Sequence, residues 1–290
     1  MPPMSSDLPR RVVTAVIAVS ILIPALVWSP FGLWTFGVVV SLISLREFYR
    51  GFGIGPTRYY VTGIAVGALL WGVVGLDIWL APEVQLPQAM YLLPAILFLP
   101  ALEIVALFYP DEKQPAVSLG ILALGIIYCY LPLYLFVDLG IPDVVSEYDF
   151  WLPFGILFLT WTLDVMSYFI GGAIGRHWLY PRISPKKTWE GAIGGAVSCF
   201  IGGMIFQYFL QPAAYSWVVI SLLIGFFSQI GDLVESMFKR SIQIKDLGNI
   251  LPGHGGMLDR FDGLLLSSVF IYLYFQAMEI GKFLMDKVSF

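Results

Sequence analysis

Charged residues are scarce in this sequence of 290 residues. Asp, Glu, Lys and Arg together make up 12%, whereas a soluble globular protein carries about 25%. Hydrophobic residues reach 58%, and the mean hydropathy is +0.82. So few charges cannot cover the surface of a water-soluble domain of this size. A soluble protein is therefore excluded, and the composition predicts a polytopic membrane protein.

Cysteine and histidine are also rare, with two residues of each. Cys129 and Cys199 lie in apolar stretches, which excludes a disulfide framework and a multi-cysteine metal site and makes them packing residues. His177 and His254 are too few for a histidine-rich metal site. The sequence also lacks a Walker-type phosphate loop, an H-E-x-x-H motif and a serine nucleophile elbow.

Apolar runs of bilayer-crossing length recur along the chain. We predict an all-α fold with about nine transmembrane helices, near residues 12–28, 32–49, 59–80, 88–109, 116–137, 151–174, 189–210, 215–237 and 263–284. With a cytoplasmic N-terminus, all of the 16 Lys and Arg residues except Lys282 and Lys287 fall on the cytoplasmic side. This distribution follows the positive-inside rule, so it predicts that orientation and supports the span count.

Polar chemistry is concentrated in the second half of the chain. Residues 1–150 are mainly apolar helices with short connections, and we assign them to packing and to a candidate dimerisation surface. Residues 151–290 form the predicted catalytic region, with its active site at the cytoplasmic rim.

The densest polar segment runs from Ser236 to Asp262. Its basic residues are Lys239, Arg240, Lys245 and Arg260. Gly253, Gly255 and Gly256 would let the backbone approach a ligand closely, with amides free to donate. The segment therefore predicts a site for phosphate and metal. The alternative is a solvated basic loop with a helix-capping aspartate.

The acids of this segment suggest the metal. Asp259 and Asp262 stand three residues apart, which places both carboxylates on one face of a starting helix. Such carboxylates repel each other, and one takes up a proton unless a cation lies between them. Oxygen ligands suit Mg²⁺, which completes its shell with water and substrate phosphates. Asp232, at the edge of a span, is a candidate third ligand because a carboxylate there needs a partner.

Three further features leave alternatives open. Glu235 precedes Lys239 by four residues, so it either belongs to the site or forms an ion pair with that lysine. Asp164, in the middle of the sixth span, predicts a functional acid that faces the bundle interior or, alternatively, a hydrogen bond between helices. The Gly171/Gly175 and Gly191/Gly195 pairs predict close helix packing or, alternatively, a part in the chemistry.

The connection between the sixth and seventh spans reads Ser184-Pro185-Lys186-Lys187-Thr188-Trp-Glu190-Gly. Ser or Thr as a cap and Pro in a first turn predict a helix N-terminus here. Such an end and two lysines attract a polyphosphate or a lipid phosphate. The alternative is a topology loop that binds anionic lipid nonspecifically.

The sequence from Ser236 to Asp262 resembles the signature of the CDP-diacylglycerol synthases, also called phosphatidate cytidylyltransferases. The shared pattern is S-x-x-K-R-x-x-x-x-K-D followed by P-x-H-G-G-x-x-D-R-x-D. The stretch from Ser184 to Gly191 and the motif Asp164-x-x-Ser-Tyr168 resemble that family too.

The resemblance implies an integral enzyme of the cytoplasmic (inner) membrane that makes CDP-diacylglycerol and pyrophosphate from CTP and phosphatidic acid. It implies a homodimer and an Mg²⁺ centre at Asp232, Asp259 and Asp262, with a further monovalent cation such as K⁺. The predicted catalytic residues are Asp232, Lys239, Arg240, Asp259, Arg260 and Asp262. The predicted substrate-binding residues are Asp164, Ser184, Lys186, Lys187, Thr188, Glu190, Ser236, Lys245, Asp246, His254, Gly255 and Gly256.

Two other functions compete with this one. A CTP-dependent polyprenol or dolichol kinase resembles the family in part, but it would release CDP rather than pyrophosphate. A transporter with Asp164 as its coupling site would have no need of the glycine-rich Lys/Asp motif.

Overall fold

Ser29 and Pro30 begin the first long helix of the structure, a computed structural model. The Ser29 hydroxyl accepts a hydrogen bond from the Gly32 amide at 3.3 Å, and Pro30 occupies the first helical position, where its missing N–H is not needed. The structure describes residues 20, 23–24, 26–27, 29–55, 58–80, 104, 107, 114–141, 148–210, 215–250 and 255–288.

The described residues contain seven helical segments long and apolar enough to cross a membrane. They match seven of the predicted spans, so the prediction of a helical polytopic membrane protein is confirmed. The predicted spans at 12–28 and 88–109 lie largely outside the described residues. The span count and the cytoplasmic N-terminus therefore stay predictions.

The chain forms two compact units. Unit 1 contains residues 1–150 and 242–260, and unit 2 contains residues 151–241 and 261–290. The segment 242–260, which we assigned to the catalytic region from sequence, thus packs with the N-terminal helices.

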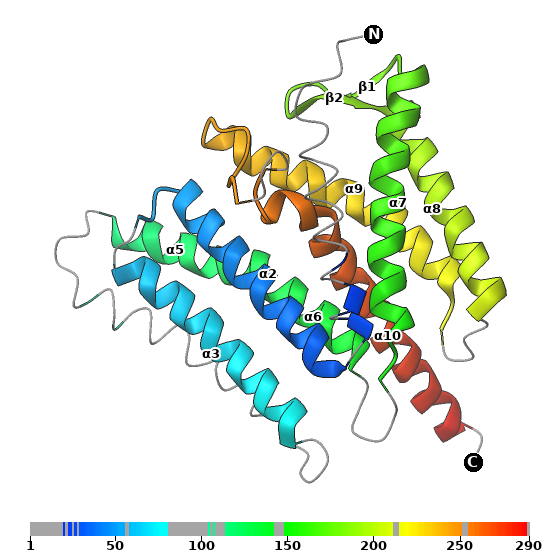
Figure 1. Cartoon of the computed structure of the whole chain (residues 1–290), viewed down its shortest axis with the longest axis horizontal. Helices are drawn as coiled ribbons and strands as arrows, with labels where there is room; N and C mark the ends of the chain where they lie inside the picture. The colour runs from blue at the N-terminus through cyan, green and yellow to red at the C-terminus, as the bar shows by residue number, and fades with distance from the viewer. Residues whose placement is uncertain are drawn as a thin grey trace. The chain divides into compact units, whose positions relative to one another are not determined.

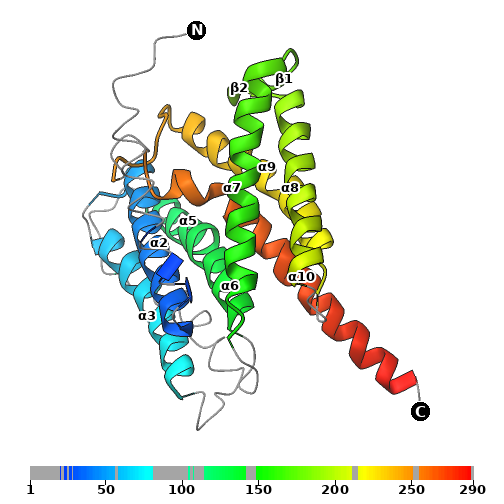
Figure 2. The same cartoon turned by 45° about the vertical axis from the view of Figure 1, so that its right-hand side comes forward.

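Unit 1 is built on α2 (Pro30–Gly51), α3 (Arg58–Leu80) and a span made of α5 (Pro115–Gly125), η1 (Ile126–Tyr130) and α6 (Leu131–Gly140). Helices α2 and α3 lie side by side in both views (Figures 1 and 2). Trp34 of α2 donates its indole N–H to the Trp71 carbonyl of α3 at 2.9 Å. Tyr49 donates its hydroxyl to the Leu122 carbonyl of α5 at 3.1 Å. These bonds tie the three described spans together.

Unit 2 contains α7 (Trp151–Ile174), α8 (Trp189–Leu210), α9 (Trp217–Ser241) and most of α10 (Leu258–Val288). Helices α7 and α8 run side by side in Figures 1 and 2. A Cβ on Gly191 would lie 2.7 Å from the Ser167 carbonyl oxygen and 3.0 Å from the Gly171 Cα. The predicted role of these glycines in close helix packing is confirmed.

Substituting Gly191 with alanine should destabilise unit 2. The new methyl group would meet the backbone of α7, which cannot rotate away, so we expect a loss of about 1–3 kcal/mol in unfolding free energy. A lower thermal unfolding midpoint in detergent would show this. Gly172→Ala is the matched control, because a Cβ there meets no atom within 4 Å. Equal midpoints for the two variants would contradict the prediction.

A short antiparallel hairpin joins α7 to α8. It pairs β1 (Trp178–Tyr180) with β2 (Ser184–Thr188), so the all-α prediction misses this small sheet. The predicted helix start at Ser184 and Pro185 is wrong, because these residues lie in β2. Proline is tolerated in an edge strand, where its missing N–H breaks no ladder bond. The helix begins at Trp189, and Thr188 caps it by accepting a hydrogen bond from the Gly191 amide at 3.2 Å.

Candidate active site

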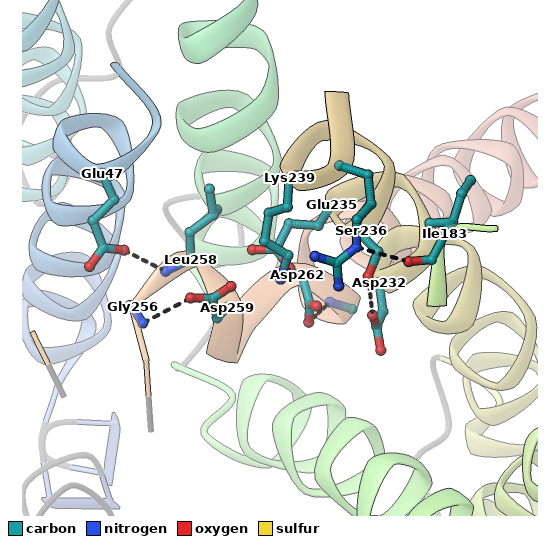
Figure 3. Close-up of polar contacts among 12 residues, drawn as sticks. Glu47, Ile183, Asp232, Glu235, Ser236, Lys239, Gly256, Leu258, Asp259 and Asp262 are labelled. Carbon is teal, nitrogen blue, oxygen red and sulfur yellow. Dashed lines mark hydrogen bonds and ion pairs between the residues drawn. The ribbon is translucent and has the colours of Figure 1, made fainter. Parts of the chain in front are cut away.

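The last turns of α9 carry most of the predicted chemistry in unit 2. The Ser236 hydroxyl donates to Asp232 Oδ1 at 3.4 Å, one turn away. Lys239 forms an ion pair with Glu235 at 2.7 Å, and both side chains are buried. The ion-pair alternative for Glu235 is therefore confirmed, and the positive charge of Lys239 is balanced locally. Figure 3 shows these four side chains on one stretch of α9.

Asp262 of α10 lies against this part of α9. A Cβ on Gly231 would be 2.7 Å from the Asp262 carbonyl oxygen, so Gly231 allows the two backbones to approach closely. The Asp262 carboxyl group contacts the Glu235 side chain and lies in the electrostatic field of both Asp232 and Lys187. Helices α9 and α10 therefore bring two of the three predicted metal ligands, Asp232 and Asp262, into one neighbourhood.

The hairpin supplies a lysine to the same neighbourhood. Lys187 of β2 forms an ion pair with Asp232, and both side chains are half-buried, with 29% and 31% exposure. Arg240, at the end of α9, donates from Nε to the Ile183 carbonyl at 3.3 Å (Figure 3). These contacts fasten the hairpin to α9. The structure thus joins two motifs that are more than forty residues apart in the sequence.

Three other residues predicted for the site, Glu190, Lys186 and Ser184, lie in the hairpin region. Glu190 accepts hydrogen bonds from the His177 side chain, at 2.6 Å from Nδ1, and from the His177 amide. It therefore holds the start of the hairpin. Lys186 is exposed, whereas Ser184 is half-buried.

Asp164 does not lie where the sequence suggested. Its side chain is exposed on α7, so the prediction that it faces the bundle interior is wrong. The reason is its position along the helix: the buried residues of α7 end at Leu163, and none of the residues from Asp164 to Ile174 is buried.

The glycine-rich turn and the start of α10 belong to unit 1. Gly255 has a φ of +83°, a left-handed conformation that glycine adopts without strain. Asp259 is buried, and its Oδ2 accepts a hydrogen bond from the Gly256 amide at 2.9 Å. The prediction that the Gly256 amide is free for a ligand is therefore wrong, because this amide binds Asp259. Gly253 and His254 lie outside the described residues.

Glu47 of α2 contacts this turn, and the sequence pattern did not predict that contact. Its side chain is 4% exposed, and its Oε2 accepts a hydrogen bond from the Leu258 amide at 3.0 Å (Figure 3). A carboxylate inside an otherwise apolar span is a signal that could have found it. Lys245, Asp246 and Arg260, also in unit 1, are exposed.

The acids suit a hard cation by their chemistry. Asp232 and Asp262 offer carboxylate oxygens in a half-buried setting, which Mg²⁺ accepts together with water and phosphate oxygens. Within the described part of the chain, no group of three or more His, Cys, Asp or Glu side chains is arranged to hold a metal ion. The metal centre at Asp232, Asp259 and Asp262 therefore stays a prediction.

Comparisons with known proteins all match this chain to cytidylyltransferases. The profile described as "Cytidylyltransferase family" matches residues 9–278. A protein of Staphylococcus aureus (strain COL) named phosphatidate cytidylyltransferase is 30% identical over 265 residues, which cover 88% of this chain and 94% of the relative.

Two more relatives carry the same name and match over shorter stretches. The protein of Brucella abortus biovar 1 (strain 9-941) is 46% identical over 129 residues, 42% of this chain and 48% of the relative. That of Bacillus subtilis (strain 168) is 40% identical over 157 residues, 53% of this chain and 57% of the relative. The chain thus spans about half the length of the Brucella relative that it matches. Because the family profile covers most of the sequence, the chain belongs to the cytidylyltransferase family.

Proposed function

We propose that this membrane protein transfers the cytidylyl group of CTP to phosphatidic acid, forming CDP-diacylglycerol and releasing pyrophosphate. The observation that carries the proposal is the contact of Lys187 with Asp232 beside Asp262. It unites the two polar motifs by which the sequence resembles phosphatidate cytidylyltransferases. The names of the relatives from three bacterial genera support the same activity.

The reaction brings two anions together, so its main obstacle is charge. The lipid phosphate must approach the α-phosphorus of CTP in line with the leaving pyrophosphate. The phosphate of phosphatidic acid is already ionised near neutral pH, so the attacking oxygen needs no strong general base. The site must instead orient the two substrates and offset their negative charge.

Two basic side chains of unit 2 are held in place by contacts with neighbouring residues. Lys187 lies next to Asp232, and Arg240 is tied to the hairpin through Ile183. We assign phosphate binding to Lys187 and Arg240, because their side chains are half-buried and exposed, whereas Lys239 is buried in its ion pair with Glu235. Lys186 and Arg260 are exposed, so their charges would attract polyphosphate from solution.

Asp232, Asp262 and Asp259 would hold Mg²⁺. When bound, the ion supplies the charge neutralisation that phosphate chemistry requires. A monovalent cation such as K⁺ and a homodimeric assembly are further expectations from the family resemblance. The distribution of Lys and Arg supports an active site that faces the cytoplasm from the inner membrane.

Incubation of the purified protein with α-labelled CTP, phosphatidic acid and Mg²⁺ tests the proposal. We expect the label to enter the lipid and pyrophosphate to be released in equal amount. Release of CDP with phosphorylation of a polyprenol would indicate a lipid kinase instead. Absence of any CTP-dependent product in a folded preparation would overturn the proposal.

A further inference from the structure

Glu47 lies in α2, far along the chain from the glycine-rich turn that it contacts. The bond from the Leu258 amide to its Oε2 joins residues 211 positions apart. The carboxyl group also accepts a hydrogen bond from the Met257 backbone. A carboxylate buried in an apolar helix is unfavourable unless it is well bonded. These two amides provide part of that bonding, and Glu47 Oε1 has no hydrogen-bond partner among the described residues.

The turn before α10 is held by acids on both sides. Asp259 accepts a hydrogen bond from the Gly256 amide, and Glu47 accepts hydrogen bonds from the amides of the next two residues. The first N–H groups of a helix have no partners within the helix and carry partial positive charge. Here the two carboxylates satisfy three consecutive N–H groups, so the backbone at the start of α10 is fixed from within and from α2.

Two glycines make room for the Glu47 carboxyl group. A Cβ on Gly256 would lie 2.6 Å from its Oε2, and a Cβ on Gly248 would overlap the same carboxyl group. Gly248 and Gly256 come from opposite ends of the segment that leads into α10. The shape of this segment is therefore matched to an acid at position 47.

We propose that Glu47 is a positioning residue for the active site, which sets the orientation of Asp259 by holding the amides at the start of α10. This inference rests on the proposed function, because it gives Asp259 a part in CTP chemistry. Glu47 and Asp259 lie within each other's electrostatic field, yet each binds different amides of the turn. Glu47 therefore acts through the backbone and not as a ligand of the substrate.

The test compares three substitutions. Glu47→Gln keeps an oxygen that can reach the Leu258 amide but removes the charge. Glu47→Asp keeps the charge but is one methylene too short. Glu47→Ala removes both. We expect kcat to fall about 10- to 100-fold in the alanine and aspartate variants, as for the loss of an outer-shell partner. Glutamine should restore most of the activity.

Hydrogen exchange of the amides in residues 255–260 provides a readout that does not depend on activity. We expect the alanine and aspartate variants to lose protection there, and the glutamine variant to keep it. The matched control is Tyr49→Phe, which removes a different buried hydrogen bond from the same helix. This control should leave the exchange of residues 255–260 and kcat unchanged.

The outcomes separate the inference from the function on which it rests. Wild-type protein without product would overturn the proposed function, while the exchange data would still test the role of Glu47. An active wild type with unaltered exchange and kcat in Glu47→Asp and Glu47→Ala would overturn the inference alone. If the alanine variant does not fold, the aspartate and glutamine variants are compared instead. A higher kcat and stronger exchange protection in Glu47→Asp than in Glu47→Gln would mean that position 47 provides charge and not reach.

Discussion

Asp259→Asn is expected to abolish CTP-dependent lipid product, with kcat/KM lower by about 1000-fold, the upper range for losing a group that stabilises charge in a transition state. The asparagine side chain has the same shape and keeps an oxygen for the Gly256 amide, which now binds Asp259 at 2.9 Å. The turn should therefore persist while the negative charge is lost. Labelled CTP incorporation measures the activity, and the thermal midpoint in detergent reports folding.

Asp77→Asn is the matched control for that experiment, because Asp77 is an acid of α3 in the same unit and no part of the predicted site. It should behave as the wild type in both measurements. Near-normal turnover by Asp259→Asn would remove Asp259 from the catalytic chemistry. A large fall in the thermal midpoint that accompanies the loss of activity would mean that Asp259 has a purely structural role.

The second large effect is expected for Lys187→Ala. Loss of this lysine leaves Asp232 and Asp262 facing each other without their nearby cation and removes a positive charge where phosphates must bind. We expect kcat/KM to fall about 100-fold, comparable to the loss of one preorganised donor. We expect the KM for CTP to rise while the thermal unfolding midpoint changes little.

Two other lysines calibrate that result. Lys186→Ala should lose less, because Lys186 is exposed on the same strand. Lys282→Ala, on the distal part of α10, should lose no activity. A Lys187→Ala protein with a lower midpoint but normal kinetics would show that the lysine only fastens the hairpin to α9.

Span-length hydrophobicity made the membrane helices predictable, because bilayer thickness imposes a length that shows directly in the sequence. The polar segment from Ser236 to Asp262 was also predictable as a group, since its basic, acidic and glycine residues follow one another. The close packing of α7 on α8 followed from Gly191 and Gly195, because small residues at this spacing form a flat helix surface.

The hairpin and the role of Glu47 were not predictable in the same way. Ser184 and Pro185 suit a helix start as well as an edge strand, and only pairing with β1 distinguishes the two. The exposure of Asp164 depends on how far the packed part of α7 extends, which its uniformly apolar sequence does not fix. Glu47 binds an amide 211 residues away in the sequence, and no local sequence pattern predicts such a contact.

Membership of residues 242–260 in unit 1 has a consequence for biosynthesis. The first 150 residues leave the ribosome long before this segment is made. The helices of unit 1 must therefore wait in the bilayer, with the Glu47 carboxyl group lacking its amide partners, until nearly the whole chain has been translated. Assembly of the N-terminal helices is thus completed late, and in a nascent chain halted after α9 the Glu47 carboxyl group would still lack the Leu258 amide.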